Sequence, residues 1–204
     1  MPDTPITRVR PDAMPADLRE AWTQSMALRG DATFFEAFGN HPDLFRWYVN
    51  EFYGRVFHGG LVDRRYKELL RLKLSTLHGC RFCNQGNRAD ASAAGFSDEE
   101  IDAITDMSSD VFQGADKAVL SLAMRLSMID TGGRIDDASF EMLSEHFDDA
   151  QIIELGMVGA FLSGMAKFLF VFDLVEKEAD CPFQTAAPAD SLRQSALYIN
   201  QTKA

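Results

Sequence analysis

Two cysteines stand close together in a chain that contains only three. Cys80 and Cys83 are separated by two residues, within the stretch STLHGCRFCNQGN. Residues three apart share a face of a helix, so two thiols in a first helical turn can come within disulfide distance. A helix N-terminus also carries unpaired N–H groups and a partial positive charge, which favour a thiolate. The pair could therefore run a redox cycle, in which one sulfur becomes a sulfenic acid and the other condenses with it to a disulfide.

Two other interpretations of the cysteine pair stay open. Zinc sites also use this spacing, but they need four ligands, and only Cys181 and His78 are obvious additions. The pair could also be two inert side chains, since a free cysteine packs as a small apolar residue. An odd number of cysteines excludes a complete set of disulfides within one chain. In a reducing compartment this motif is more often catalytic or metal-binding than structural.

Three polar residues near the pair could serve its chemistry. Glu68, twelve residues before Cys80, could accept the proton that leaves a thiol if it folds back against the pair. The alternative for Glu68 is a solvated position on a helix surface. Asn87, one turn after Cys83, could orient a water or a thiolate by hydrogen bonding. His78 could carry protons near neutral pH, or it could be a solvated residue at a helix C-terminus.

The elements that position these residues should all be helices. Apolar residues recur at helical spacing throughout, and no apolar run alternates with a period of two. Gly79 is the residue type expected just past a helix C-terminus, so one helix should end there and the next begin at the cysteines. Ser97 and Glu100 have the spacing of a capping box. The predicted helices cover approximately residues 16–29, 31–38, 42–58, 62–78, 80–94, 116–130, 137–146 and 149–176, with a short one after residue 97.

Length and composition indicate one domain. The 204 residues suit a single domain, and the contents of 46% hydrophobic and 25% charged residues are typical of a soluble globular protein. We predict an all-α, single-domain helical bundle over residues 16–178, with an N-terminal arm at 1–15 and a C-terminal tail at 179–204.

The charge and the apolar runs limit the expected partners. A net charge of −11 argues against a nucleic-acid partner, whose phosphates need a basic face. No apolar run reaches the roughly 20 residues that cross a bilayer, and the first residues contain no apolar signal region. We therefore expect a cytoplasmic protein with neither a nucleic acid nor a membrane as partner.

The segment around the cysteines resembles a known family. Glu68 followed by Gly79-Cys80-x-x-Cys83 between two predicted helices is similar to the carboxymuconolactone decarboxylase superfamily, and within it to the alkylhydroperoxidase D-like, peroxidase-related branch. The likeness centres on residues 41–106, and DKAVLSLAMRLSMID and FDDAQIIELGMVGAFLSGMAKF extend it to roughly two-thirds of the chain.

The resemblance implies a fold, an activity and roles for the residues. It implies an all-helical protein that assembles as a homo-oligomer, a trimer or hexamer, and reduces a hydroperoxide substrate with electrons from an external dithiol. Cys83 would be the peroxidatic thiol, Cys80 its proton donor and resolving partner, and Glu68 the base of a proton relay. The helix N-terminus alone would favour Cys80 as the more acidic thiol. No metal, flavin or haem is implied.

One position departs from the family pattern. The pattern has a histidine four residues after the second cysteine, where this chain has Asn87. Either the proton path runs through water and Glu68, with His78 as a substitute imidazole, or peroxidase activity is weak. Two other functions are therefore kept: a non-enzymatic redox-sensing or ligand-binding helical oligomer, and a lactone decarboxylase. Decarboxylases of this superfamily do not rely on a cysteine pair, so both cysteines count against that activity.

Overall fold

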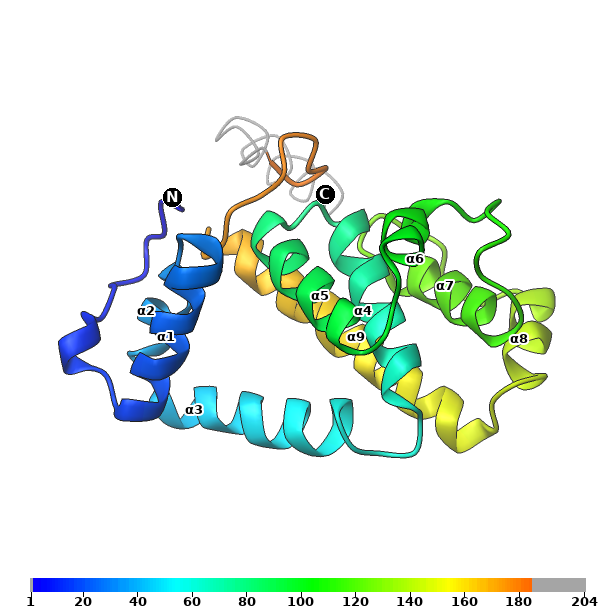
Figure 1. The fold of residues 1–204 in the computed structure, drawn as a ribbon, viewed down its shortest axis with the longest axis horizontal. Coiled ribbons are helices and arrows are strands. Elements are labelled where there is room, and N and C mark those ends of the chain that lie inside the picture. Colours follow the sequence, from blue (N-terminus) through cyan, green and yellow to red (C-terminus); the bar gives the residue numbers. More distant parts are fainter. Residues whose placement is uncertain (1, 185–204) are drawn as a thin grey trace, which may run out of the picture.

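The computed structural model describes residues 2–184, and within them all regular structure is helical (Figure 1). The prediction of an all-α fold is therefore confirmed. Two short 3-10 helices and one π-helix accompany the α-helices. In chain order the elements are η1 Pro11–Ala13, α1 Ala16–Arg29, α2 Thr33–Phe38, α3 Pro42–Trp47, η2 Tyr48–Phe57, α4 Arg64–Leu77, α5 Arg81–Ala93, α6 Asp98–Asp102, η3 Ala103–Thr105, α7 Ala115–Leu126, α8 Asp137–Ser144 and α9 Asp149–Val171.

Helix α4 is the centre of the bundle and packs against α5, α7 and α9. Its leucines lie in a core cluster shared with α7 and the first half of α9. A second cluster joins α1, α2 and α3 to the far end of α9, and Cys80 belongs to it. Figure 1 shows α1 and α2 at one end of the molecule and α7 and α8 at the other, with α3 and η2 along one edge. Tyr48 packs against both clusters.

The helix expected at residues 42–58 changes type halfway along its length. It begins as α3 and continues as the π-helix η2, in which hydrogen bonds run between residues five apart. The N–H of His58 accordingly donates to the carbonyl of Tyr53 at 2.8 Å. This spacing brings Tyr48, Tyr53 and His58 to the same side of the segment, and all three line one cavity.

Two helices end earlier than predicted, and the reason is local backbone. Helix α7 stops at Leu126 because Ser127 is extended. Helix α9 stops at Val171, and Asp173 then takes a positive φ of 47° that turns the chain. The residues that follow cross the start of α5, where Glu178 N–H donates to the Gly79 carbonyl at 2.8 Å. The described part of the predicted tail, up to residue 184, therefore packs beside the cysteines, while 185–204 lie outside the described residues.

Capping follows the sequence at two helices. The capping box of Ser97 and Glu100 is present at α6, as predicted. Before α2, the Oδ1 of Asp31 accepts from the Thr33 N–H at 3.0 Å, and the helix begins at Thr33, two residues later than predicted.

Helix α9 is shorter than predicted but more apolar than the sequence indicated. Within residues 2–184 it alone has the length and hydropathy to cross a membrane, with 33% of that apolar window buried. The expectation that no segment reaches this length is wrong, because the glycines and the single Lys167 interrupt the apolar character less than assumed. One such helix is weak evidence for a membrane, since core helices of soluble proteins have the same composition.

Candidate active site

Cys80 and Cys83 are joined in a disulfide at the start of α5. Cys80 is the N-cap residue, and its sulfur accepts from the Cys83 N–H at 3.2 Å. The two Cα atoms are 5.2 Å apart. The predicted arrangement, a cysteine pair at a helix N-terminus after a glycine break, is therefore present. Cys80 is fully buried and Cys83 is half-buried.

Gly79 permits this arrangement because of its backbone and its neighbour. Its φ is +64°, a conformation that other residues rarely adopt, and an added Cβ would lie 2.6 Å from the Cα of Cys181. Cys181 is a buried free thiol that donates to the carbonyl of His78 at 3.1 Å. Residues 2–184 contain no cluster of three or more His, Cys, Asp or Glu side chains suited to a metal.

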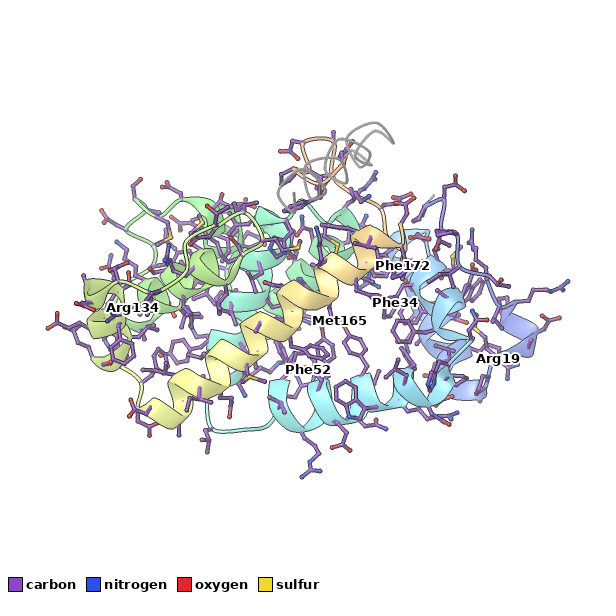
Figure 2. All side chains as sticks on the ribbon, turned by 180° about the vertical axis from the view of Figure 1, so that it is seen from behind. Arg19, Phe34, Phe52, Arg134, Met165 and Phe172 are labelled. Carbon is purple, nitrogen blue, oxygen red and sulfur yellow. A yellow bond between two sulfur atoms is a disulfide. The ribbon has the colours of Figure 1, made fainter. Side chains whose placement is uncertain are left out.

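Both cysteines line a cavity of about 370 Å³. Helices α1, α2, α3, α4, α5 and α9 and the π-helix η2 all contribute to its wall. Figure 2 shows Phe34 on α2 and Met165 on α9 extending into the region between these helices. The volume lies within the range of small-molecule sites, and most of the wall is apolar, as such sites usually are. The apolar lining consists of Ala21, Phe34, Phe35, Phe45, Val49, Leu74, Phe82, Leu162, Met165, Ala166 and Leu169.

Glu68 is fully buried, so the solvated alternative is wrong. Its Oε1 accepts from Arg64 at 3.0 Å and its Oε2 from Arg71. Arg71 lines the cavity and also pairs with Asp90 at 2.8 Å, whereas Glu68 is absent from the lining. Glu68 thus reaches the cavity through Arg71. Its role as a base stays a prediction.

His78 is also buried, with an exposed fraction of 1%, so it is not a solvated residue either. Its Nε2 accepts from the Met128 N–H at 3.0 Å, which places the ring proton on Nδ1. Burial lowers the pKa of His78 to about 4. The ring lines the cavity as a neutral imidazole whose basic nitrogen is already engaged. Asn87 lies half-buried in the same wall.

The structure adds polar residues that the sequence analysis did not select. Tyr48 and Tyr53 come from η2, His58 is the residue that caps its C-terminus, and their spacing of five was the available signal. Burial, and then the charge of Arg64, lower the pKa of His58. Arg29 comes from α1, and no sequence signal connects it to the cysteines.

Comparisons with known proteins agree with this geometry. Residues 42–124 match the family model "Carboxymuconolactone decarboxylase family". The uncharacterized protein YdfG of Bacillus subtilis is 26% identical over 98 residues, which are 48% of this chain and 66% of that protein. The matched region thus spans just under two thirds of that relative.

Solved structures share the fold over most of the chain. One is an uncharacterized peroxidase-related protein from Ralstonia eutropha, described as an alkylhydroperoxidase AhpD core, with 17% identity, a TM-score of 0.66 and coverage of 88% of this chain and 95% of that one. Another is a cysteine-to-alanine variant of the debrominase Bmp8 in complex with 2,3,4-tribromopyrrole, with 18% identity, a TM-score of 0.67 and coverage of 94% and 97%. A protein of unknown function from Agrobacterium tumefaciens, titled a putative antioxidant defence protein AhpD, has 24% identity, a TM-score of 0.59 and coverage of 66% and 91%.

Proposed function

Since residues 42–124 carry the carboxymuconolactone decarboxylase family segment and the chain has the alkylhydroperoxidase D-like helical fold, we propose that this protein is a thiol-dependent peroxidase. The observation that carries the proposal is the pair Cys80–Cys83 in the wall of a 370 Å³ cavity. The family and its structural neighbours include enzymes, which supports a catalytic protein. The specific activity, an organic hydroperoxide as substrate and a cytoplasmic location are parts of the proposal.

The reaction needs only the two sulfurs and an external dithiol. The thiolate of Cys83 attacks the O–O bond of the hydroperoxide, which yields a sulfenic acid and releases the alcohol after one protonation. The thiolate of Cys80 then attacks the oxidised sulfur, so that the disulfide forms and hydroxide leaves as water. An external dithiol reduces this disulfide by exchange. In sum, one hydroperoxide and one dithiol give one alcohol, one water and one external disulfide.

The burial of the two sulfurs supports this division of roles. Cys83 is the more open of the two to the cavity wall, since Cys80 is fully buried. A buried thiol at the N-cap position is stabilised as a thiolate by the helix N-terminus and is protected from oxidants. Cys80 is therefore suited to be the resolving thiol, and Cys83 is suited to react with the hydroperoxide.

The proton path runs along the polar side of the cavity. His58 and Asn87 line it together with the ion pair of Arg71 and Asp90. His58 supplies an imidazole, which can accept the thiol proton directly or through one water. Glu68 pairs with Arg71 and does not line the cavity itself. It therefore acts on the proton path only by positioning the Arg71 guanidinium.

The first experiment titrates free thiols before and after a small excess of cumene hydroperoxide. Wild type should lose two thiols per chain, and Cys83→Ser should form no disulfide between the two positions. Cys80→Ser should stop at a sulfenic acid, which dimedone traps. Unchanged thiols in wild type would contradict the proposal.

A turnover assay separates the remaining alternatives. With excess dithiothreitol, an enzyme consumes many equivalents of hydroperoxide per chain, whereas a redox sensor consumes one. A lactone decarboxylase would keep its activity in the Cys80→Ser, Cys83→Ser double variant.

One observation favours a second candidate, reductive dehalogenation. Six of the lining residues are phenylalanine or tyrosine on α2, α3, η2 and α5, and one structural neighbour is a debrominase bound to a brominated pyrrole. In that reaction the Cys83 thiolate takes the bromine to form a sulfenyl bromide, and the ring carbon takes up a proton in its place. The Cys80 thiolate then displaces bromide from that sulfur and the disulfide forms. Release of bromide from 2,3,4-tribromopyrrole with dithiothreitol would identify this activity.

A further inference from the structure

The charges around the cavity do not cancel. Arg64, Glu68, Arg71 and Asp90 form one connected set of ion pairs, with two positive and two negative charges. Arg29 lines the same cavity and takes no part in that set. It is therefore the surplus positive charge of the wall.

Arg29 is held in place but is not neutralised. Its Nε donates to the carbonyl of Phe82 at 3.1 Å, and its guanidinium lies 4.5 Å from the centroid of the Phe82 ring. Among the residues that the structure describes, the carboxylate of the cavity wall, Asp90, pairs with Arg71 and not with Arg29. Asp90 and Asp31 act on Arg29 only from farther away. Asp31 does not line the cavity, and its Oδ1 accepts from Thr33. The two terminal nitrogens of Arg29 thus have donors to spare.

Gly86 positions Arg29 along the face of α5 that carries the active sulfur. A Cβ at Gly86 would collide with a terminal nitrogen of Arg29, so the absence of a side chain there creates the space. Gly86 is three residues after Cys83, and residues three apart share a helix face. The guanidinium consequently lies beside the face of α5 that carries Cys83. The ring and carbonyl of Phe82 and the space at Gly86 hold it there.

We propose that Arg29 selects hydroperoxides that combine a bulky apolar body with an anionic group, a carboxylate in the simplest case. This inference rests on the proposed peroxidase function and adds its substrate class. The aromatic wall receives the body, and the fork of Arg29 receives the anion with paired hydrogen bonds. An anion that replaces water at a partly buried, unpaired guanidinium gains more than it would at an exposed one, because competing solvent is reduced.

The test compares two substrates of nearly the same shape. Cumene hydroperoxide is neutral, and its para-carboxy derivative adds only the anion. The variants are Arg29→Gln, which removes the charge, and Arg29→Lys, which keeps the charge without the fork. Arg19→Gln is the matched control, because Arg19 is an exposed arginine on the same helix α1 and its replacement changes the net charge equally (Figure 2).

Wild type should prefer the carboxylate substrate in kcat/KM, and Arg29→Gln should lower that preference about 10- to 100-fold, the range of a charged hydrogen bond. Arg29→Gln should lower the rate with the carboxylate substrate by a larger factor than the rate with cumene hydroperoxide. The preference of Arg29→Lys should lie between those of wild type and Arg29→Gln. Arg19→Gln should behave as wild type. An equal loss with both substrates would overturn the inference, since Arg29 would then act on the thiols or the fold.

A binding measurement keeps this inference separate from the peroxidase proposal. 4-Isopropylbenzoate has the same body and carboxylate but no peroxide, and calorimetry measures its binding to wild type and Arg29→Gln without turnover. If neither hydroperoxide is consumed, the peroxidase proposal fails. Weaker binding of the carboxylate to Arg29→Gln would then still support the anion site, and equal binding to both proteins would overturn it.

Discussion

We propose His58 as the imidazole that serves the cysteines. It lines their cavity from the end of η2, while Asn87 occupies the position one turn after Cys83. His78 lines the cavity too, but its Nε2 accepts a backbone N–H. A group that accepts and returns a proton near neutral pH typically contributes about 10²- to 10⁴-fold to a rate.

We therefore expect His58→Asn to lower the kcat/KM for cumene hydroperoxide at pH 7 by about tenfold or more. Adding Asn87→His to that variant should restore much of the loss, because it returns an imidazole to the same wall. The rate is followed as dithiothreitol-dependent peroxide consumption. Wild-type activity in His58→Asn would remove His58 from the proton path.

His78 gives stability a defined pH dependence. An unfolded histidine has a pKa of about 6.5, whereas burial lowers the pKa of His78 to about 4. The unfolded chain thus binds more protons between these values, so this contribution is complete above pH 6.5 and is lost progressively as the pH falls toward 4. Between pH 7.5 and pH 4.5 it amounts to roughly 2–3 kcal/mol.

Urea unfolding of wild type and His78→Gln across this range measures the effect. The glutamine oxygen can still accept from Met128 but does not titrate, so the variant should lose less stability on acidification than wild type. Carboxylates whose pKa is lowered, such as Asp106 and Asp136, lose stability equally in both proteins. Parallel curves for the two proteins would mean that His78 is not held neutral.

The sequence predicted the site residues that are close together in the chain. It did not predict the site residues that other helices bring to the cavity on folding. His78, Cys80, Cys83 and Asn87 lie within ten positions and all line the cavity. Arg29 belongs to a helix that meets α5 only after folding, so its relation to Cys83 has no local signal.

At the scale of elements, substitution of two glycines by alanine should change the free energy of unfolding in opposite directions. Gly54 is exposed in η2, and a Cβ there would meet only the Val49 carbonyl at an ordinary 3.5 Å. Gly54→Ala should therefore raise the free energy of unfolding by about 0.5–1 kcal/mol, because alanine loses less backbone entropy in a helix.

Gly79→Ala should instead lower the free energy of unfolding by at least about 2 kcal/mol, because it combines a left-handed backbone with a steric clash. Its φ is +64°, and its Cβ would meet the backbone of Cys181. Denaturant unfolding of both variants measures the sign of each change in the free energy of unfolding. Similar stabilities for Gly79→Ala and wild type would show that the turn before the cysteines has no need of glycine.

The helices themselves were largely predictable, but the type of η2 was not. Apolar spacing predicted helical backbone at residues 42–58, and the helical segment does end at Phe57. The periodicity of an α-helix does not place residues five apart on one face, so it gives no reason to group Tyr48, Tyr53 and His58. Which hydrogen-bond pattern a segment adopts depends on what its side chains meet, and Tyr48 meets two separate core clusters.

At the scale of the whole molecule, the outer face of α9 lacks a partner within the described chain. Ile153, Met157 and Val171 are each more than 60% exposed, and with Ala160, Gly164 and Lys167 they follow alternating steps of four and three residues. This is the heptad spacing by which helices pack against one another. Gly159 packs against Leu126 inside the chain, whereas a Cβ at Gly156 or Gly164 would meet nothing there.

We therefore predict that the protein is a homo-oligomer in which α9 packs against a second copy. Met157→Glu should shift sedimentation velocity profiles toward the monomer, because a carboxylate would be buried in an apolar contact at a cost of several kcal/mol. Phe140→Glu is the control, since Phe140 is an exposed apolar residue on α8, outside the stripe. An unchanged oligomer in Met157→Glu would exclude this face. A wild-type protein that sediments as a monomer would contradict the prediction.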